Sequence, residues 1–299
     1  MAFRNVIIQN PASISLRNSQ LIIRTDAEHS LAIEDISALL IESRQTTISA
    51  AALSRLGESG CAVFMCDEKH MPCAVMRSFA GHSRELAVLK SQLNAGEVLK
   101  KRLWQSLVSA KVRNQAACLR FCGAGQTAEG LERMAAEVRS GDSGNTEAAA
   151  AQRYFPALFG RGFTRSREDG INSALNYGYA IVRGAMARCL AVYGFLPALG
   201  LHHRSELNNF NLADDLMEPF RPVVDMLVYV NFESEDSLST AGKRLLFNCL
   251  NLDVISGGQR HSLAYAAERL VQSLGRALGS GRAELILPEL TELKQHSYE

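Results

Sequence analysis

Short apolar runs separated by polar turn residues fill the first eighty residues of the chain. Residues 14–17 alternate apolar and polar side chains, Asn18 and Ser19 are turn formers, and an apolar run resumes at Leu21. Alternation around a two-residue turn predicts a β-hairpin. Residues 39–41 and 61–64 are apolar runs of the length of buried strands, and residues 49–56 between them have the composition of a helix.

After residue 80 the pattern becomes helical, because apolar residues recur at three- and four-residue spacing. The positions that show this spacing are Leu86, Leu89, Leu93, Leu103, Leu107 and Ala110. Breaks at residues 122–125, 140–145, 256–258 and 279–281 separate the predicted helices. We therefore expect an α+β protein. A small β-rich N-terminal domain (residues 1–80), serving as a scaffold or for dimerisation, precedes a larger all-α C-terminal domain (residues 81–299).

Composition places the chain among ordinary globular proteins. It has 299 residues, 47% of them apolar and 21% charged. Since no stretch approaches the roughly 18 continuous apolar residues of a membrane helix, and no signal peptide is evident, we expect a cytoplasmic protein without a membrane partner. The seven cysteines form no Cys-x-x-Cys pair, which argues against a structural zinc site or a disulfide framework.

The net charge of +1 conceals a strong segregation of charge along the chain. Residues 81–125 carry eight basic side chains against two acidic ones, and residues 206–236 carry eight acidic side chains against one arginine. Basic helices beside an acidic segment suit a metal-dependent enzyme that acts on DNA. Solvated helix faces that happen to cluster would give the same pattern.

The first candidate for chemistry is an acidic residue at a predicted helix start. Glu147 follows residues 144–146, Gly-Asn-Thr, which favour a helix cap, and precedes four alanines. An acidic residue in a first turn also stabilises the helix dipole by about 0.3–1 kcal/mol, which would be reason enough for its presence. The alanine run that follows weakens this explanation, since small side chains let other backbone approach closely.

Two further segments supply possible ligands. His202 and His203 follow Gly200, and at most one of two adjacent histidines can face a given point. Asp215 and Glu218 are three residues apart and therefore share one helix face.

The surroundings of these acids allow a simpler role as well. Either Asp214 or Asp215 could cap a helix that begins here, and acidic residues in a first turn favour the dipole. Pro219 and Pro222 predict an irregular turn in the same segment.

The three segments together offer two or three carboxylates and one imidazole. Mixed oxygen and nitrogen donors suit Mg²⁺ or Mn²⁺ better than zinc or copper. The chemistry that they favour is phosphoryl transfer, in which the cation polarises a scissile phosphate. The sequence contains no glycine-rich phosphate loop, His-Glu-x-x-His or Gly-x-Ser-x-Gly motif that would indicate another reaction.

The order and spacing of these motifs resemble a known family. Residues 215–222, Asp-Leu-Met-Glu-Pro-Phe-Arg-Pro, resemble a motif of the CRISPR-associated integrase family in its type II branch. Glu218 lies fifteen positions after His203, the separation found in that family. Glu147 with its small neighbours is similar to the first motif of the family, and residues 172–179 are similar to its asparagine–tyrosine helix. The resemblance covers the whole chain.

This resemblance implies a metal-dependent DNA integrase and endonuclease of CRISPR spacer acquisition. Such an enzyme is a homodimer that joins a small companion protein and captures a short foreign DNA duplex. A 3′-hydroxyl of the duplex then attacks a phosphodiester at the leader–repeat junction of the array.

The resemblance also implies roles for individual residues. Glu147, His203 and Glu218 would hold one Mg²⁺ or Mn²⁺, with Asp215 as a neighbouring or substitute ligand. Residues expected to support the site are Arg221, Asn172 and Tyr177, although an Asn–Tyr hydrogen bond would serve helix packing equally well. Candidates for contacts to the backbone of double-stranded DNA are Arg84, Lys100, Lys101, Arg102, Lys111, Arg113, Arg161, Arg165 and Arg167.

Two other functions remain open from the sequence. A metal-dependent endonuclease of branched DNA in repair could use the same residues with water as the nucleophile. A non-catalytic DNA-binding scaffold would use its acidic residues only as helix caps, and losing Glu147 or Glu218 would then leave its activity intact.

Overall fold

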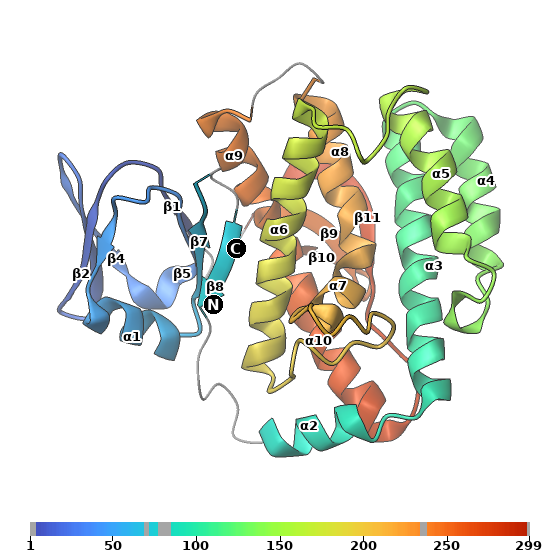
Figure 1. The fold of residues 1–299 in the computed structure, drawn as a ribbon, viewed down its shortest axis with the longest axis horizontal. Coiled ribbons are helices and arrows are strands. Elements are labelled where there is room, and N and C mark those ends of the chain that lie inside the picture. Colours follow the sequence, from blue (N-terminus) through green and yellow to red (C-terminus); the bar gives the residue numbers. More distant parts are fainter. Residues whose placement is uncertain (1–3, 69–71, 77–84, 234–237, 298–299) are drawn as a thin grey trace. The chain divides into compact units, whose positions relative to one another are not determined.

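The computed structural model describes residues 4–68, 72–76, 85–233 and 238–297 (Figure 1). The chain divides into two compact units, residues 1–83 and residues 84–299. The described part of the first unit is rich in strands and that of the second is mostly helical. The predicted α+β class, with strands first and helices after, is therefore confirmed.

The described residues of the N-terminal unit form two four-stranded sheets, with strand orders β1-β5-β7-β8 and β4-β3-β2-β6. In the first sheet β1, β5 and β7 are parallel and β8 is an antiparallel edge strand. The elements are β1 (Arg4–Ile8), β2 (Ser13–Arg17), β3 (Gln20–Arg24), β4 (Glu28–Ala32), β5 (Ile36–Ile41), β6 (Thr47–Ile48), α1 (Ala50–Glu58), β7 (Ala62–Cys66) and β8 (Pro72–Met76).

The local chemistry of this unit follows the sequence. Asn18 and Ser19 both adopt positive φ, 50° and 60°, which is the conformation that a two-residue hairpin turn requires. The predicted hairpin is thus confirmed as β2 and β3. The Ser49 side chain accepts a hydrogen bond from the Ala52 N–H at 3.2 Å and so begins α1, where a helix was predicted.

The C-terminal unit is built around α3, which is 25 residues long and packs against α4, α5, α8 and β11. Figure 1 shows α3 and α5 side by side. The helices are α2 (Glu85–Leu93), α3 (Glu97–Phe121), α4 (Gly125–Ala136), α5 (Thr146–Phe159), α6 (Gly170–Val192), α7 (Asn211–Met217), α8 (Arg221–Asn231), α9 (Thr240–Phe247) and α10 (Leu263–Ser280). A short 3-10 turn, η3 (Glu218–Phe220), joins α7 to α8.

The expectation that the second unit is all-helical was wrong in one region. A three-stranded antiparallel sheet forms there in the order β10-β9-β11, from β9 (Leu252–Ser256), β10 (Gln259–Ser262) and β11 (Pro288–Gln295). The break at residues 256–258 is a hairpin turn, since Gly257 and Gly258 both have positive φ, 61° and 78°. The flanking strands are too short for their alternation to stand out from a helical pattern.

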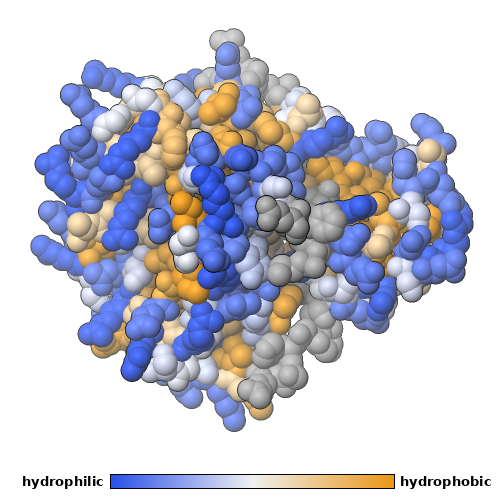
Figure 2. Space-filling view, turned by 180° about the vertical axis from the view of Figure 1, so that it is seen from behind, coloured by the Kyte–Doolittle hydropathy of each residue, from blue (hydrophilic) through white to orange (hydrophobic). Residues whose placement is uncertain are grey.

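The outer surface combines polar and apolar side chains. No helix within the described ranges is long and apolar enough to cross a membrane. Figure 2 shows hydrophilic side chains mixed with separate apolar areas on the face that it presents. Large apolar side chains are exposed at, among other positions, Leu86, Leu93 and Val98.

Candidate active site

The acidic residues singled out in the sequence meet around a buried lysine in the middle of α3. The ammonium of Lys111 lies 2.6 Å from Glu147 Oε1 and also contacts Glu218 Oε2. Lys111 is only 8% exposed, so protein carboxylates rather than solvent balance its charge. Two acidic residues far apart in the sequence therefore converge on one cationic nitrogen.

Glu147 is positioned by the N-terminus of α5. The helix begins at Thr146, which puts Glu147 in the first turn, as expected. The predicted cap was wrong, however, because Asn145 has a left-handed conformation and its side chain caps nothing. Asp142 caps the helix instead, since its carboxylate accepts hydrogen bonds from the N–H groups of Thr146 at 2.8 Å and Glu147 at 3.0 Å.

Glu218 is positioned by the 3-10 turn between α7 and α8. Pro219 and Pro222 interrupt regular helical hydrogen bonding here, and the irregular turn predicted from them is present. The amide of Asn114, one helical turn from Lys111 on α3, donates to the Pro219 carbonyl at 2.7 Å. Arg221 Nε lies 2.9 Å from Glu218 Oε1. Cations from α3 and α8 thus hold the Glu218 carboxylate on both sides.

Asp215 is fully buried and organises the loop that carries the histidines. Its carboxylate accepts hydrogen bonds from the backbone N–H groups of Leu201 (2.6 Å), His202 (3.0 Å) and His203 (3.2 Å). It also lies 2.6 Å from Nδ1 of His203. An ionised carboxylate can only accept, so Nδ1 carries the proton and Nε2 is the nitrogen left for a cation.

The same loop depends on a glycine. A Cβ at Gly200 would lie 2.3 Å from the carbonyl oxygen of His203 and 2.9 Å from Asp215 Oδ2. Only glycine allows the backbone to approach so closely. The glycine before the histidines thus has a steric reason that is independent of any ligand.

Neither aspartate caps a helix, contrary to one of the alternatives raised by the sequence. Helix α7 begins at Asn211, so Asp214 and Asp215 lie within it. Asp214 pairs with Arg183 at 2.7 Å, whereas Asp215 faces the histidine loop. Adjacent carboxylates therefore have separate tasks.

Trp104, the single tryptophan of the sequence, supports the histidine loop from α3. Its ring stacks on His202 with centroids 4.3 Å apart and an interplanar angle of 1°, and it meets the ring of His203 edge-on at 5.7 Å. The two histidine rings are inclined at 84° and face different directions. Since Asp215 holds His203 through its ring, the geometry favours His203 over His202 as the ligand.

The electrostatics of the site favour the charged forms of Glu218 and Lys111. Burial opposes ionisation of Glu218, but Lys111 and Arg221 outweigh it, and the pKa of Glu218 lies below its ordinary value. Burial likewise opposes the charge on Lys111, but the two glutamates raise its pKa above the ordinary value. The hydrogen bond to Asp215 raises the pKa of His203, and the negative charge of Glu218 adds to this effect.

A further buried carboxylate, that of Asp225, lies on α8. The hydroxyls of Tyr154 and Tyr179 both donate to Asp225, the former at 3.0 Å. Burial raises the pKa of Asp225 to about 6, although these hydrogen bonds and Arg221 act in the other direction. The guanidinium of Arg221 lies 4.7 Å from the ring centroid of Tyr179. This network links α5, α6 and α8, and it places the Tyr179 ring beside the guanidinium of Arg221.

The donor set fits a divalent cation in its chemistry. Glu147 and Glu218 reach the same nitrogen, and the His203 side chain is 42% exposed and feels the charge of Glu218. Carboxylate oxygens with one imidazole suit Mg²⁺ or Mn²⁺. As they stand, no three His, Cys, Asp or Glu side chains in the described part of the chain are arranged as a metal site. The ammonium of Lys111 lies between the two carboxylates instead.

Comparison with known families decides the relationship of the chain. The family described as CRISPR associated protein Cas1 matches residues 6–237, more than half of the sequence. The chain belongs to the Cas1 family. A similar curated Cas1 protein is the CRISPR-associated endonuclease Cas1 of Neisseria meningitidis serogroup C (strain 8013), which is 44% identical over 304 residues spanning 100% of both chains.

Solved structures share the fold of this Cas1 protein at lower identity. A casposase bound to integration product superposes with a TM-score of 0.78 and 20% identity, covering 95% of this chain and 92% of that chain. A Cas6-RT-Cas1–Cas2 complex gives a TM-score of 0.73 and 19% identity, covering 98% of this chain and 36% of that chain. At such identities the likeness shows the Cas1 fold alone.

Arg221, Asn172 and Tyr177, the residues expected to support the site, have different surroundings in the structure. Arg221 contacts Glu218 directly. Asn172 lies in the first turn of α6, where its side-chain amide donates to the Thr164 carbonyl at 2.9 Å and its backbone N–H donates to the capping Asp169 carboxylate at 2.8 Å. Tyr177 is buried within α6. The structure thus supports a direct role at the site for Arg221.

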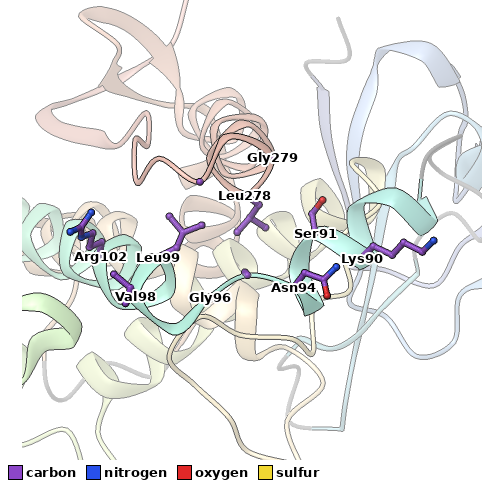
Figure 3. A pocket seen from close by; sticks show the side chains of 11 residues that line it. Lys90, Ser91, Asn94, Gly96, Val98, Leu99, Arg102, Leu278 and Gly279 are labelled. Carbon is purple, nitrogen blue, oxygen red and sulfur yellow. The ribbon is translucent and has the colours of Figure 1, made fainter.

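The candidate DNA contacts on α3 divide into two groups. The expectation for Lys111 needs correction, because its side chain is buried among carboxylates and is not part of the surface. Lys101, Arg102 and Arg113 are exposed, and Lys100 is partly buried 3.8 Å from Glu97. Arg102 lines a hollow of about 540 Å³ where α2 and α3 meet the end of α10 (Figure 3).

The remaining basic candidates lie mainly in the loop between α5 and α6. Arg161 and Arg167 are exposed there. Arg165 is partly buried and donates to the side chains of Asn172 and Asn176, the latter at 2.6 Å, so it braces the loop against α6. Arg84 lies outside the described residues. The exposed arginines remain proposals for contact with DNA.

Sequence reasoning missed Lys111, Asp142 and Asn114 as parts of the site. Lys111 carried a readable signal, because it continues the buried stripe of α3 formed by Leu103 and Leu107 at four-residue spacing. A lysine in an apolar stripe is seldom buried without a partner, so it points to nearby carboxylates. Asn114 acts through a contact with the distant backbone of Pro219, for which the sequence offers no pattern. Asp142 caps α5 from four and five residues away, but the sequence favours the cap formers at residues 144–146, which stand nearer to the helix start.

Proposed function

We propose that this Cas1 protein is a metal-dependent DNA integrase of CRISPR adaptation, which inserts short foreign duplexes into a CRISPR array. In this reaction a 3′-hydroxyl oxygen of the incoming duplex forms a bond to the phosphorus at the leader–repeat junction. The bond to the leaving 3′-oxygen breaks, and the proton of the hydroxyl passes to that oxygen through solvent. One phosphodiester replaces another, so the step needs no separate energy source.

The observation that carries the proposal is the convergence of Glu147 and Glu218 on one cationic nitrogen. Beside them, His203 presents Nε2 from a loop that Asp215 fixes through four hydrogen bonds. Preorganised ligands of this kind are typical of a catalytic cation site, because their outer partners fix ligand orientation. Helix caps would not require a carboxylate as buried as Glu218, which argues against a purely structural scaffold.

Each residue of the site has a role in this proposal. Glu147, His203 and Glu218 would hold Mg²⁺ or Mn²⁺, and such an ion would supply polarisation of the scissile phosphate and stabilisation of charge on the leaving oxygen. Asp215 orients the imidazole and keeps the proton on Nδ1. Arg221 contacts one oxygen of Glu218, and the other oxygen contacts the Lys111 ammonium, which Glu147 also reaches.

The partners of the reaction are proposed from the family. Double-stranded DNA is the substrate, and a solved relative is described as bound to integration product. A second copy of this chain and a small companion protein complete the assembly, by analogy with the Cas1–Cas2 association named in another relative. We assign residues 1–80 to scaffolding or dimerisation and residues 81–299 to catalysis and DNA binding.

The alternative is hydrolysis of DNA with water as nucleophile. It deserves a test because the Neisseria relative is named an endonuclease. The same cation site would serve both reactions, so product analysis must separate them. Joined products on an array plasmid indicate integration, whereas nicked or shortened strands without joining indicate an endonuclease of branched DNA.

The first prediction concerns the cation. Strand transfer of a labelled duplex into a supercoiled CRISPR plasmid should disappear in chelator and return with Mn²⁺ or Mg²⁺. The assay is run both with and without the companion protein. Activity should fall by more than about 100-fold without the ion, since the cation stabilises charge that the chain cannot otherwise offset. Full activity in chelator would overturn the proposed mechanism.

The second prediction concerns the exposed end of α3. Duplex binding should weaken steeply with salt, because phosphate contacts release counterions. Replacing Lys100, Lys101 and Arg102 together with alanine should lower the slope of log affinity against log salt by roughly 2–3, at about 0.9 per lost contact. Filter binding over a salt series measures the slope, and thermal melting checks the fold. An unchanged slope would move the DNA path away from this end of α3.

A further inference from the structure

The charges around Lys111 cancel without any bound ion. Glu147 and Glu218 contribute two negative charges, and Lys111 and Arg221 contribute two positive ones. The cluster is therefore formally neutral, and each carboxylate contacts the lysine. A divalent cation between the same two carboxylates would bring a net charge of +2 into this buried cluster.

Lys111 and a divalent cation cannot share this position at low cost. Like charges a few ångströms apart in a poorly solvated site repel strongly, and the carboxylate oxygens that a cation would bind already contact the ammonium. An ion that occupies the site must therefore displace the ammonium from at least one glutamate. The two cations are competitors for one pair of ligands.

The type of residue suits displacement. A lysine bears a compact charge on a flexible four-carbon stem, whereas an arginine such as Arg221 holds a carboxylate through a rigid planar group. Residue 111 lies near the middle of α3, so the side chain can move while the helix backbone stays in place. The Glu147 side chain is 29% exposed against 4% for Glu218, which makes the Glu147 side the open side of the site.

We propose that Lys111 is a built-in counter-cation, which holds the two glutamates together in the ion-free protein and is displaced when the catalytic cation binds. The lysine thereby stabilises the fold before the ion arrives, and it lowers the affinity of the site for that ion. Lys111 is a positioning residue in this scheme, because it acts through the ligands. The inference rests on the cation site of the proposed function.

The test is a measurement of Mn²⁺ binding to the full-length protein without DNA, by calorimetry and by electron paramagnetic resonance of free Mn²⁺. Lys111→Met should bind Mn²⁺ at least roughly tenfold more tightly than the wild type, a size usual for coupling between two sites. Its melting temperature should be lower than that of the wild type in chelator, and Mn²⁺ should raise it by more than it raises that of the wild type.

Two matched variants separate competition from other effects. Lys90→Met removes the same charge from an exposed position on α2 and should leave Mn²⁺ affinity unchanged. Lys111→Arg keeps the charge and should not bind Mn²⁺ more tightly than the wild type. If Lys90→Met and Lys111→Met tightened binding equally, overall charge would explain the effect and the proposal would fail.

The other outcomes are equally decisive. A lysine with only a structural role predicts that Lys111→Met loses the same stability with and without Mn²⁺ and binds the ion no more tightly, which would overturn the proposal. Failure of Lys111→Met to fold even with Mn²⁺ would count against it as well, because the ion should replace the missing charge. Absence of Mn²⁺ binding by the wild type would refute the cation site of the proposed function. That result differs from the two preceding outcomes, which concern Lys111 alone.

Discussion

Glu147→Ala, His203→Ala and Glu218→Gln are each expected to reduce strand transfer by more than roughly 1,000-fold, because all three groups are proposed to meet at one cation. Their combined effect should be far smaller than the sum of the single effects, as for other residues that act as a unit. Glutamine is chosen at position 218 because truncation there would leave Lys111 and Arg221 without their buried partner. The measurement is the initial rate of joining labelled duplex ends to a CRISPR plasmid.

His202→Ala is the matched control for this series. Its ring stacks on Trp104 and meets the ring of His203 edge to face, so its loss should cost some stability and little activity. An inactive His202→Ala beside an active His203→Ala would show that the ligand is the neighbouring residue. Normal integration by all three core variants would show that these residues do not form the catalytic site. The scaffold function would then take the place of the proposed one for this part of the protein.

Asp215→Asn is expected to lower integration by about 100-fold and the melting temperature by roughly 5–10 °C. Three backbone N–H groups and the imidazole of His203 all bond to the carboxylate. An asparagine would turn an NH₂ group toward some of these donors, and each unpaired buried donor costs about 1–3 kcal/mol. Loss of orientation at a ligand alone costs about 10–100-fold in metal affinity or activity. Melting curves and Mn²⁺ affinity should therefore change together.

Asp214→Asn provides the control for Asp215. It removes the same charge one residue away, where the carboxylate pairs with Arg183 and Asn208 instead of the histidine loop. Its effect on integration should be less than about tenfold, as is usual for a partly exposed ion pair. Equal losses in the two variants would mean that general negative potential matters, and that the loop contacts of Asp215 do not.

The sequence predicted those parts of the molecule in which local chemistry determines structure. The hairpin at Asn18 and Ser19 and the helix after Ser49 each depend on neighbouring residues, and both are present. The hairpin at Gly257 and Gly258 was interpreted as a break between helices, because glycine pairs occur in both contexts and the strands beside it are short.

At the candidate site, the sequence predicted which residues take part better than it predicted their contacts. Spacing placed Asp215 and Glu218 on one helix face, because residues three apart align on a helix. It could not show that Asp215 would bond to the histidine loop while its neighbour Asp214 would not, since the path of residues 200–210 decides this. Nor could charge patterning show that Lys111 faces inward, because its assignment to DNA came from a count of basic residues. Its place in the apolar stripe of α3 was the better guide.

The stacking of Trp104 on His202 makes the histidine loop optically observable. The chain has one tryptophan, so its emission arises from a single indole in contact with both histidine rings. Movement of the loop, or binding of a paramagnetic ion such as Mn²⁺ near His203, should alter the intensity and lifetime of this emission. Ordering of the loop can thus be followed in real time in the unlabelled wild-type protein, by stopped-flow fluorescence, before any phosphodiester bond is exchanged.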